Sequence, residues 1–189
     1  MSGRSTPSQT VGPFFSIGFA WLERADLTQG ASTEAKFSIH GRVLDGDEKP
    51  VPDAVLEIWQ ADADGRYAHE EDASERMAAG KFCGFGRVPV NDGGEFYFTT
   101  VKPGRVEGRY GTRQAPHLVV SVFMRGLLKR LITRIYFPGD PANDTDSVLS
   151  LVPAARRGTL IARAESEPEK TLVWDVHLQG DHETVFFDY

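Results

Sequence analysis

The sequence alternates hydrophobic and polar residues over short runs, and glycine, proline, asparagine or aspartate closes most of these runs. In KFSIHGRVLD, the residues Phe37, Ile39, Gly41 and Val43 fall on one face with a period of two. This period is typical of a β-strand with one buried face. Helical periodicity is weak throughout. The pattern therefore restricts the chain to an all-β architecture.

Two chain reversals are predicted within this pattern. NDGG lies between FGRVPV and EFYFTTV and predicts a β-hairpin, and a second reversal near Gly126 separates HLVVSVFM from LITRIYF. About eight strands at such spacing predict a β-sandwich of antiparallel or mixed sheets with long loops. Short helices are predicted over residues 72–80 and over DTDSVLSLV, the second capped by Asp144 or Asp146.

The first thirteen residues, MSGRSTPSQTVGP, have no periodicity. We expect an N-terminal arm over residues 1–13 and one β-sandwich domain over residues 14–189. The run FFSIGFAWL that follows the arm is shorter than the ~20 residues that span a bilayer, and its charged flank does not suit a signal peptide. We therefore expect a cytoplasmic protein. Because the run FFSIGFAWL is so apolar, it needs to be buried, and this favours an N-terminal arm that is docked on another surface.

Charge and cysteine content exclude several classes of function. The chain has 21 basic and 27 acidic residues, for a net charge of −6, which argues against a nucleic-acid surface. Its single cysteine, Cys83, allows no internal disulfide. We expect neither a nucleic-acid partner nor a membrane partner.

No local motif identifies a catalytic centre. The five histidines form no HExxH or His-x-His arrangement, and the chain has no serine-nucleophile elbow, phosphate-binding loop or dinucleotide fingerprint. Each lone histidine is by default a solvated or hydrogen-bonded structural residue. The residues taken alone predict a β-sandwich with no assigned chemistry.

Six motifs, in order along nearly the whole chain, resemble the intradiol ring-cleaving dioxygenases. They are PSQTVGPFFSIG, LEIWQADADGRY, CGFGRVPVNDGGEFYFTTVKPG, APH, LITRIYFPGD and LQGDHETVFFDY. The first and the last are more similar to the alpha chain than to the iron-bearing beta chain of the two-chain family members, whose substrate is protocatechuate. The resemblance implies a ferric ion held by two tyrosinates and two histidines in the catalytic chains.

Only two of these four ligands have a counterpart here. The first tyrosine corresponds to Tyr67 in the GRY context, and the first histidine corresponds to His117 after QAP. The second tyrosine position, two residues beyond the glycine of KPG, is Val106, and the second histidine position is Val119. Valine has no donor atom, so the resemblance implies a vestigial site that binds no metal and no catalytic residue in this chain.

Two further positions of the vestigial site differ from the catalytic chains. An arginine three residues before the first histidine is here Gln114, and a glutamine of the catalytic chains is here Arg134. Arg134 could fill the emptied pocket and pair with Tyr67 or an acid, and a residual anion site there stays open.

The resemblance implies a supporting role beside a homologous beta chain that carries Fe³⁺ and acts on protocatechuate and O₂. Thr10, Gly12, Pro13 and Arg125 are then expected to form part of the wall of the partner's substrate pocket, with the Arg125 guanidinium near the substrate carboxylate.

Such an obligate interface is expected to bury well over about 2,000 Å². The aromatic residues expected in it are Phe14, Phe15, Phe186 and Phe187.

Two alternatives remain open from the sequence. One is a self-sufficient intradiol dioxygenase that recruits Tyr110 or Glu107 as a replacement ligand. The other is a non-catalytic β-sandwich that binds an aromatic acid without converting it.

Overall fold

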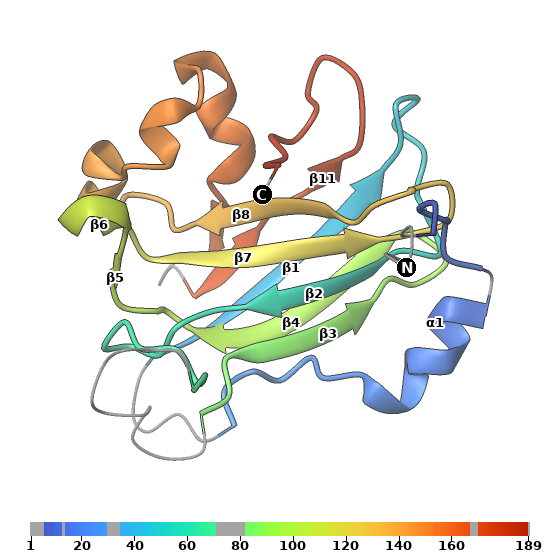
Figure 1. The fold of residues 1–189 in the computed structure, drawn as a ribbon, viewed down its shortest axis with the longest axis horizontal. Helices are drawn as coiled ribbons and strands as arrows, with labels where there is room; N and C mark the ends of the chain where they lie inside the picture. Colours follow the sequence, from blue (N-terminus) through green and yellow to red (C-terminus); the bar gives the residue numbers. More distant parts are fainter. Residues whose placement is uncertain (1–5, 13, 30–34, 71–81, 167–169, 189) are drawn as a thin grey trace, which may run out of the picture.

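The computed structural model describes residues 6–12, 14–29, 35–70, 82–166 and 170–188. Most of the regular structure within these residues is β-strand (Figure 1). The helix predicted over residues 72–80 lies outside the described residues, and so does Pro13.

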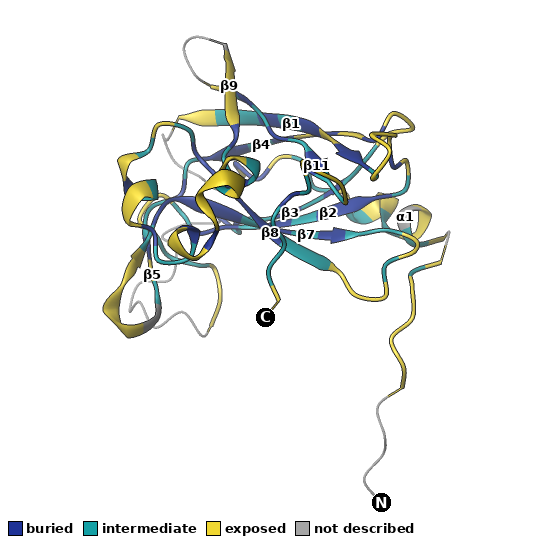
Figure 2. Cartoon of the chain, turned by 90° about the horizontal axis from the view of Figure 1, so that it is seen from above, coloured by how far each residue is buried: buried dark blue, intermediate teal, exposed yellow. Residues whose placement is uncertain are grey.

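Two β-sheets pack face to face, and Figure 2 shows these two layers edge-on. The first sheet is mixed, and its strands are β1 (Lys36–Leu44), β4 (Glu95–Val101), β9 (Arg163–Ser166), β10 (Thr171–Val173) and β11 (Val176–His177). In it, β1 pairs antiparallel with β4 and parallel with β10 and β11. The second sheet is antiparallel, in the order β3 (Phe85–Pro89), β2 (Val55–Trp59), β7 (His117–Phe123) and β8 (Leu131–Tyr136). The predicted all-β sandwich is confirmed.

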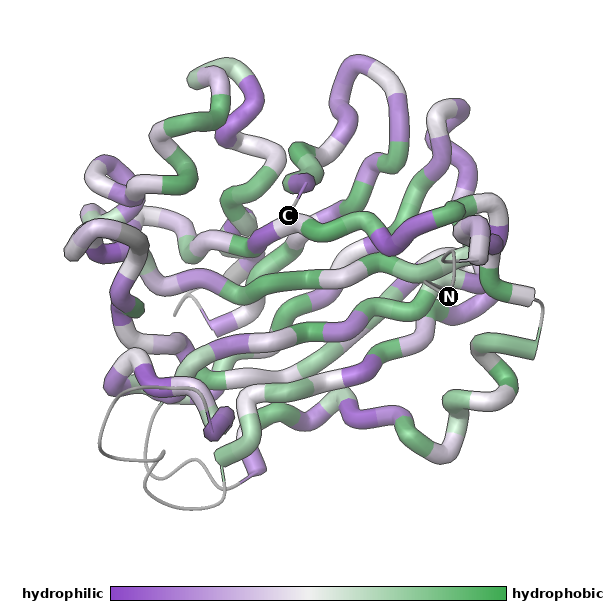
Figure 3. The backbone as a smooth tube through the Cα atoms, in the orientation of Figure 1, coloured by the Kyte–Doolittle hydropathy of each residue, from purple (hydrophilic) through white to green (hydrophobic). Residues whose placement is uncertain are grey.

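Short elements complete the described chain. A two-stranded ladder joins β5 (Val106–Glu107) to β6 (Arg113–Gln114). The α-helix is α1 (Phe14–Phe19), and the 3₁₀ helices are η1 (Ala20–Leu22), η2 (Arg109–Gly111), η3 (Pro141–Thr145), η4 (Leu149–Leu151) and η5 (Ala154–Leu160). Figure 3 shows green hydrophobic stretches along the strands and α1, whereas purple hydrophilic stretches lie mostly in the loops.

The core lies between the sheets because alternate residues of each strand point inward. Ile39 and Phe98 from the first sheet, and Leu56 and Leu118 from the second, are fully buried within one cluster. The other residues of β7, including His117 and Val119, consequently lie on the outer face of the second sheet. This alternation places the candidate site outside the sandwich core.

The NDGG segment forms a turn but not the predicted hairpin. Asn91 and Glu95 close the turn, since the Asn91 N–H donates to the Glu95 carbonyl at 2.9 Å. However, β3 pairs with β2 and β4 pairs with β1, so the two flanking strands belong to different sheets. The hairpin prediction was wrong because turn chemistry is local, whereas strand partners are chosen by long-range packing. The reversal predicted near Gly126 does join antiparallel neighbours, β7 and β8.

The helix predicted over residues 144–152 is also different in the structure. The segment contains the end of η3 and the short η4, separated by an extended backbone at Asp146. Asp146 does act as a cap, because its Oδ1 accepts hydrogen bonds from the N–H groups of Val148 and Leu149 at 2.9 and 2.6 Å. The same carboxylate also accepts hydrogen bonds from the Ala115 N–H and the Tyr136 hydroxyl, which hold it buried in the protein.

The described part of the arm, residues 6–12, has no regular secondary structure and is largely exposed. Figure 2 shows it running away from the body of the sandwich. Thr10 joins it to the β7–β8 reversal, because Thr10 Oγ1 accepts a hydrogen bond from the Gly126 N–H at 2.7 Å.

Candidate functional site

The positions that the sequence predicts as a vestigial site lie at one end of the second sheet. Val119 lies opposite Trp59 of β2 on one side and opposite Arg134 of β8 on the other. His117 lies two residues away on the same strand and faces Tyr136 of β8. These side chains share the outer face of the sheet because directly opposite residues of an antiparallel pair point the same way.

Tyr67 reaches this site through a tight turn after β2. Asp62 organises the turn, since its Oδ1 accepts hydrogen bonds from the Asp64 and Arg66 N–H groups, each at 2.9 Å. Gly65 has a φ of 80°, and a side chain there would collide with the Arg105 carbonyl. Tyr67 then stacks on Trp59, with ring centroids 5.9 Å apart and an interplanar angle of 7°.

The β5–β6 ladder brings in the remaining positions. Val106 pairs with Gln114, and Gln114 Oε1 accepts a hydrogen bond from Arg134 Nη1 at 2.6 Å. The six vestigial positions are thereby connected through Trp59, strand pairing and this hydrogen bond. They are Tyr67, Val106, Gln114, His117, Val119 and Arg134.

His117 is held as a neutral, oriented imidazole. Its side chain is buried, with the ring centroid 5.7 Å from that of Tyr136. Its Nδ1 is 2.8 Å from the Ala115 carbonyl oxygen, which can only accept, so Nδ1 carries the hydrogen. Burial, and then the positive charge of Arg134, lowers the pKa of His117 from 6.5 to about 4. Nε2 therefore carries the lone pair at neutral pH.

A buried polar network backs this imidazole. The Tyr136 hydroxyl donates to Asp146 Oδ1 at 3.0 Å, and Arg134 Nη1 lies 3.4 Å from the same hydroxyl. Asp146 Oδ2 also accepts from the Ala115 N–H at 2.7 Å. Burial raises the pKa of Tyr136 well above its ordinary value, so this phenol stays protonated.

Sequence reasoning missed the roles of Tyr136 and Asp146. The sequence signal at Asp146 was that of a helix cap, and no local signal linked it to Ala115, 31 residues away. Only the folded structure shows that the Asp146 carboxylate accepts a hydrogen bond from the N–H of Ala115, the residue whose carbonyl orients His117.

The residues of this site do not fit a ferric ion. Two of the four positions that the resemblance assigns to ligands are valines, and the Arg134 guanidinium adds a positive charge beside Val119. Fe³⁺ favours anionic oxygen donors, and a neighbouring cation repels it. In the part of the chain that the structure describes, no group of three or more His, Cys, Asp or Glu side chains is placed to hold a metal ion.

The replacement ligands considered from the sequence do not reach the site. Tyr110 is 100% exposed and takes a left-handed backbone conformation at φ 58°, and Glu107 is exposed on β5. Neither side chain is buried beside His117. The structure therefore disfavours a self-sufficient metal centre built on them.

Of the residues predicted to form a pocket wall, the described ones, Thr10, Gly12 and Arg125, lie at the opposite end of β7. Thr10 bonds to Gly126, the neighbour of Arg125, and Gly12 accepts a hydrogen bond from the Phe15 N–H at 3.1 Å. Arg125 Nε forms an ion pair with Asp53 Oδ2 at 2.5 Å, and its side chain is 57% exposed. Since β7 spans seven residues, about 20 Å separates this region from the vestigial site.

The aromatic residues predicted for a partner interface differ in their exposure. Phe14 is 76% exposed, whereas Phe15 contacts Phe123 with ring centroids 5.7 Å apart. Phe186 and Phe187 are partly buried. Phe186 packs against the core between the sheets, and Phe187 packs against a second buried cluster that includes Tyr136 and Leu160. Three of the four side chains thus already contact their own chain.

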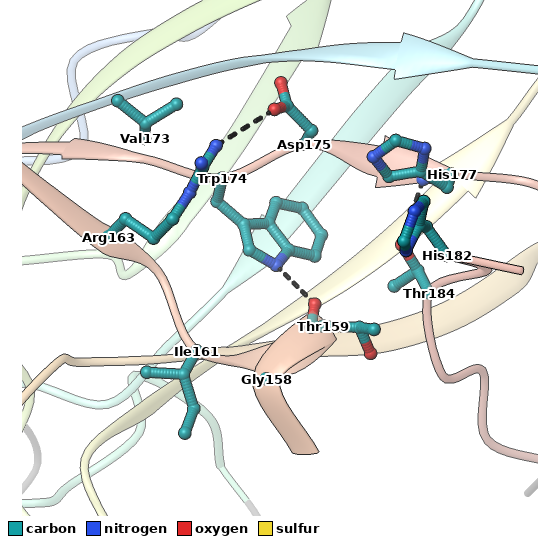
Figure 4. Close-up of a pocket in the computed structure, with 10 residues that line it drawn as sticks. All are labelled: Gly158, Thr159, Ile161, Arg163, Val173, Trp174, Asp175, His177, His182 and Thr184. Carbon is teal, nitrogen blue, oxygen red and sulfur yellow. Dashed lines mark hydrogen bonds and ion pairs between the residues drawn. The ribbon is translucent and has the colours of Figure 1, made fainter. Parts of the chain in front are cut away.

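An open pocket of about 310 Å³ lies on the first sheet, between the end of η5 and the segment after β11 (Figure 4). Its polar groups contact one another. Arg163 pairs with Asp175 at 3.3 Å, and the Trp174 indole N–H donates to the Thr159 carbonyl at 3.0 Å. These contacts engage the pocket's main donors within the chain, and we assign no ligand to it.

The helices of the described residues are all too short or too polar to cross a membrane.

Comparison with known proteins agrees with the geometry. A family model described as "Dioxygenase" matches residues 11–180. The protocatechuate 3,4-dioxygenase alpha chain of Burkholderia cepacia is 40% identical over 199 aligned positions, covering 98% of each chain. The beta chain from the same organism is 37% identical over 75% of this chain and 61% of its own length.

Among solved structures, the dioxygenase domain of a carbohydrate-binding fusion protein from Streptomyces sp. SirexAA-E superposes with a TM-score of 0.63 at 24% identity. That match covers 95% of this chain and 96% of the other, and it supports the fold. The chain belongs to the intradiol ring-cleaving dioxygenase family.

Proposed function

We propose that this chain is the non-iron alpha subunit of a protocatechuate 3,4-dioxygenase. The assembled enzyme opens the ring of 3,4-dihydroxybenzoate with O₂, between the two hydroxyl groups, to give 3-carboxy-cis,cis-muconate. Two observations support the proposal: near full-length similarity to alpha chains, and valines at 106 and 119, the positions that the resemblance assigns to iron ligands, beside the Arg134 cation. The second observation carries the assignment, because it separates this chain from an iron-bearing one.

The catalytic iron then belongs to a homologous beta chain. A ferric ion there would bind the catechol oxygens and make the ring reactive toward O₂. The present chain contributes shape and charge to the surroundings of the substrate.

Thr10, Gly12, Pro13 and Arg125 form the proposed contribution to the pocket wall. Arg125 is exposed and supplies a guanidinium that can bind the substrate carboxylate. Asp53 accepts a hydrogen bond from Arg125 Nε, which orients the guanidinium, and the Arg125 side chain as a whole is 57% exposed. Thr10 holds the arm against the same chain reversal, so arm and cation form one continuous surface.

The rest of the chain provides the scaffold of this surface. Residues 1–13 form the arm and residues 14–189 form a single domain. The protein acts in the cytoplasm, with the beta chain as partner and without nucleic acid or membrane. The vestigial site serves as a packed polar cluster, not as a catalytic centre.

Iron content tests the proposal most directly. The chain is purified alone and then co-expressed with its beta partner, and iron and the visible spectrum are measured on both samples. We expect a colourless, iron-free lone chain and a coloured pair that holds one iron for each alpha-beta unit and cleaves protocatechuate. A coloured lone chain that cleaves protocatechuate would overturn the proposal.

A further inference from the structure

The segment formed by α1 and η1 is hydrophobic on two opposite sides. Of its nine residues, FFSIGFAWL, seven are hydrophobic. Phe14, Ile17 and Trp21 are 76%, 68% and 79% exposed, and their spacing of three and four residues places them on one side. We call these three residues the α1 face.

The opposite side of the segment already packs on the second sheet. Phe15 contacts Phe123 of β7, and the Arg87 guanidinium of β3 lies 4.6 Å from the centre of the Phe19 ring. Phe15 and Phe19 also contact each other edge to face, with centroids 4.8 Å apart. These contacts hold the segment beside β3, as Figure 1 shows, so the α1 face cannot turn inward without breaking them.

The α1 face is unusual for a free surface. A helix that is hydrophobic on all sides is normally buried, and a contiguous exposed patch of large apolar side chains marks an interaction site. Figure 3 shows no hydrophilic stretch along α1. Aromatic side chains such as Trp21 are typical anchors at the centre of protein interfaces.

The position of the α1 face identifies its occupant. Gly12 belongs to the proposed wall of the partner's pocket, and its carbonyl accepts a hydrogen bond from the Phe15 N–H at 3.1 Å. Phe14 is two residues from Gly12, so their Cα atoms are no more than about 7 Å apart. A protein that contacts Gly12 therefore extends over Phe14 as well.

We infer that the α1 face is a docking surface for the iron-bearing beta chain, continuous with the pocket wall formed by the arm and Arg125. The inference rests on the proposed function, and it names the part of this chain that anchors the partner. It makes the arm and the α1 face one binding unit: Thr10 and Gly12 close the pocket, and Phe14, Ile17 and Trp21 hold the arm in place.

The test uses the co-expressed complex with the double variant Phe14→Ser/Trp21→Ser. Both side chains are largely exposed, so folding of the chain is expected to persist, with an unchanged circular dichroism spectrum. We expect the dissociation constant of the pair to rise by about tenfold or more.

A matched control removes an equally exposed hydrophobic side chain elsewhere. Leu151 is 81% exposed on η4, and Leu151→Ser should leave the dissociation constant unchanged. A second readout uses 5-fluorotryptophan, with the ¹⁹F signal of Trp21 assigned through its loss in Trp21→Ser. Its relaxation by a soluble paramagnetic agent should fall when the beta chain binds.

The outcomes separate the two proposals. In one outcome, the wild-type pair forms and cleaves protocatechuate, the double variant assembles normally, and Trp21 stays accessible. This outcome overturns the docking inference and leaves the proposed function intact. In another outcome, the lone chain self-associates through Trp21 and continues to do so when the beta chain is present. The α1 face would then bind a second copy of this chain, and the docking inference would be overturned. Failure of the wild-type chains to form any iron-bearing pair overturns the proposed function, and this inference with it.

Discussion

Val119 lies directly opposite Arg134 in the antiparallel pairing of β7 with β8. The first has no donor atom, and the second carries a buried guanidinium that donates to Gln114 at 2.6 Å. The proposed change from a metal site to a structural cluster therefore has two parts, the loss of ligands and the gain of a positive charge. The two parts can be separated by mutation.

Restoring ligands alone should fail to restore iron binding. We expect lone chains with Val106→Tyr/Val119→His to retain little iron against a chelator, because the Arg134 charge opposes a cation by ~4 kcal/mol per unit charge at about 4 Å. Adding Arg134→Gln should raise iron retention at least severalfold. Iron per chain after dialysis measures the effect, and equal retention with and without Arg134→Gln would contradict the role given to this charge.

Tyr67 should matter for packing and not for metal. The variant Tyr67→Phe keeps the ring that stacks on Trp59, so the assembled enzyme should keep its iron content and change turnover by less than about twofold. Tyr67→Ala is the informative companion, since loss of the ring should destabilise the chain by about 1–3 kcal/mol. A large loss of iron in Tyr67→Phe would show that the site is misassigned.

Arg125 should act on substrate binding. In the assembled complex, Arg125→Ala is expected to raise KM for protocatechuate by about tenfold, because one charged hydrogen-bond partner of the carboxylate is lost. Iron content should stay unchanged. Arg130→Ala, an exposed arginine on the same chain reversal, serves as the control. An unchanged KM in Arg125→Ala would remove this residue from the proposed pocket wall.

Asp146 should be among the most sensitive positions of the fold. Its carboxylate is buried and accepts from the Tyr136 hydroxyl and from the N–H groups of Ala115, Val148 and Leu149. Asp146→Ala leaves these donors unsatisfied and should lower the free energy of unfolding by about 3–5 kcal/mol. The exposed neighbour provides the comparison, since Asp144→Ala should cost less than about 1 kcal/mol. Denaturant unfolding of both variants decides the point.

His117 should make stability depend on pH. Its pKa in the folded chain is lowered to about 4 from 6.5, so between these values the unfolded chain binds the additional proton. Stability therefore falls as the pH drops through this range, by up to about 3 kcal/mol in total.

The variant His117→Gln should flatten this part of the pH profile of unfolding. Equal slopes for His117→Gln and the wild type would mean that His117 titrates normally in the folded chain.

The sequence by itself determined the all-β class, the strand faces and the family, because all three depend on short-range patterns. The alternation of Phe37, Ile39, Gly41 and Val43 indicated the inward face of β1, and the observed burial follows it. The motif spacing around Tyr67 and His117 predicted the vestigial positions, and in the structure Val119 pairs with Arg134 and Val106 with Gln114. Hydrophobic period and turn chemistry are properties of neighbouring residues, so they can be read along the chain.

Only the tertiary structure decided which strands pair and which charges meet. The NDGG turn connects two sheets because β4 pairs with β1, about fifty residues upstream, and not with its neighbour in sequence, β3. Asp146 bonds to Ala115 and Tyr136 only because the segment between η3 and η4 returns to the end of the second sheet. Similarly, α1 exposes one hydrophobic side because β3 and β7 cover the other. These relations depend on long-range packing, which no local pattern of residues specifies.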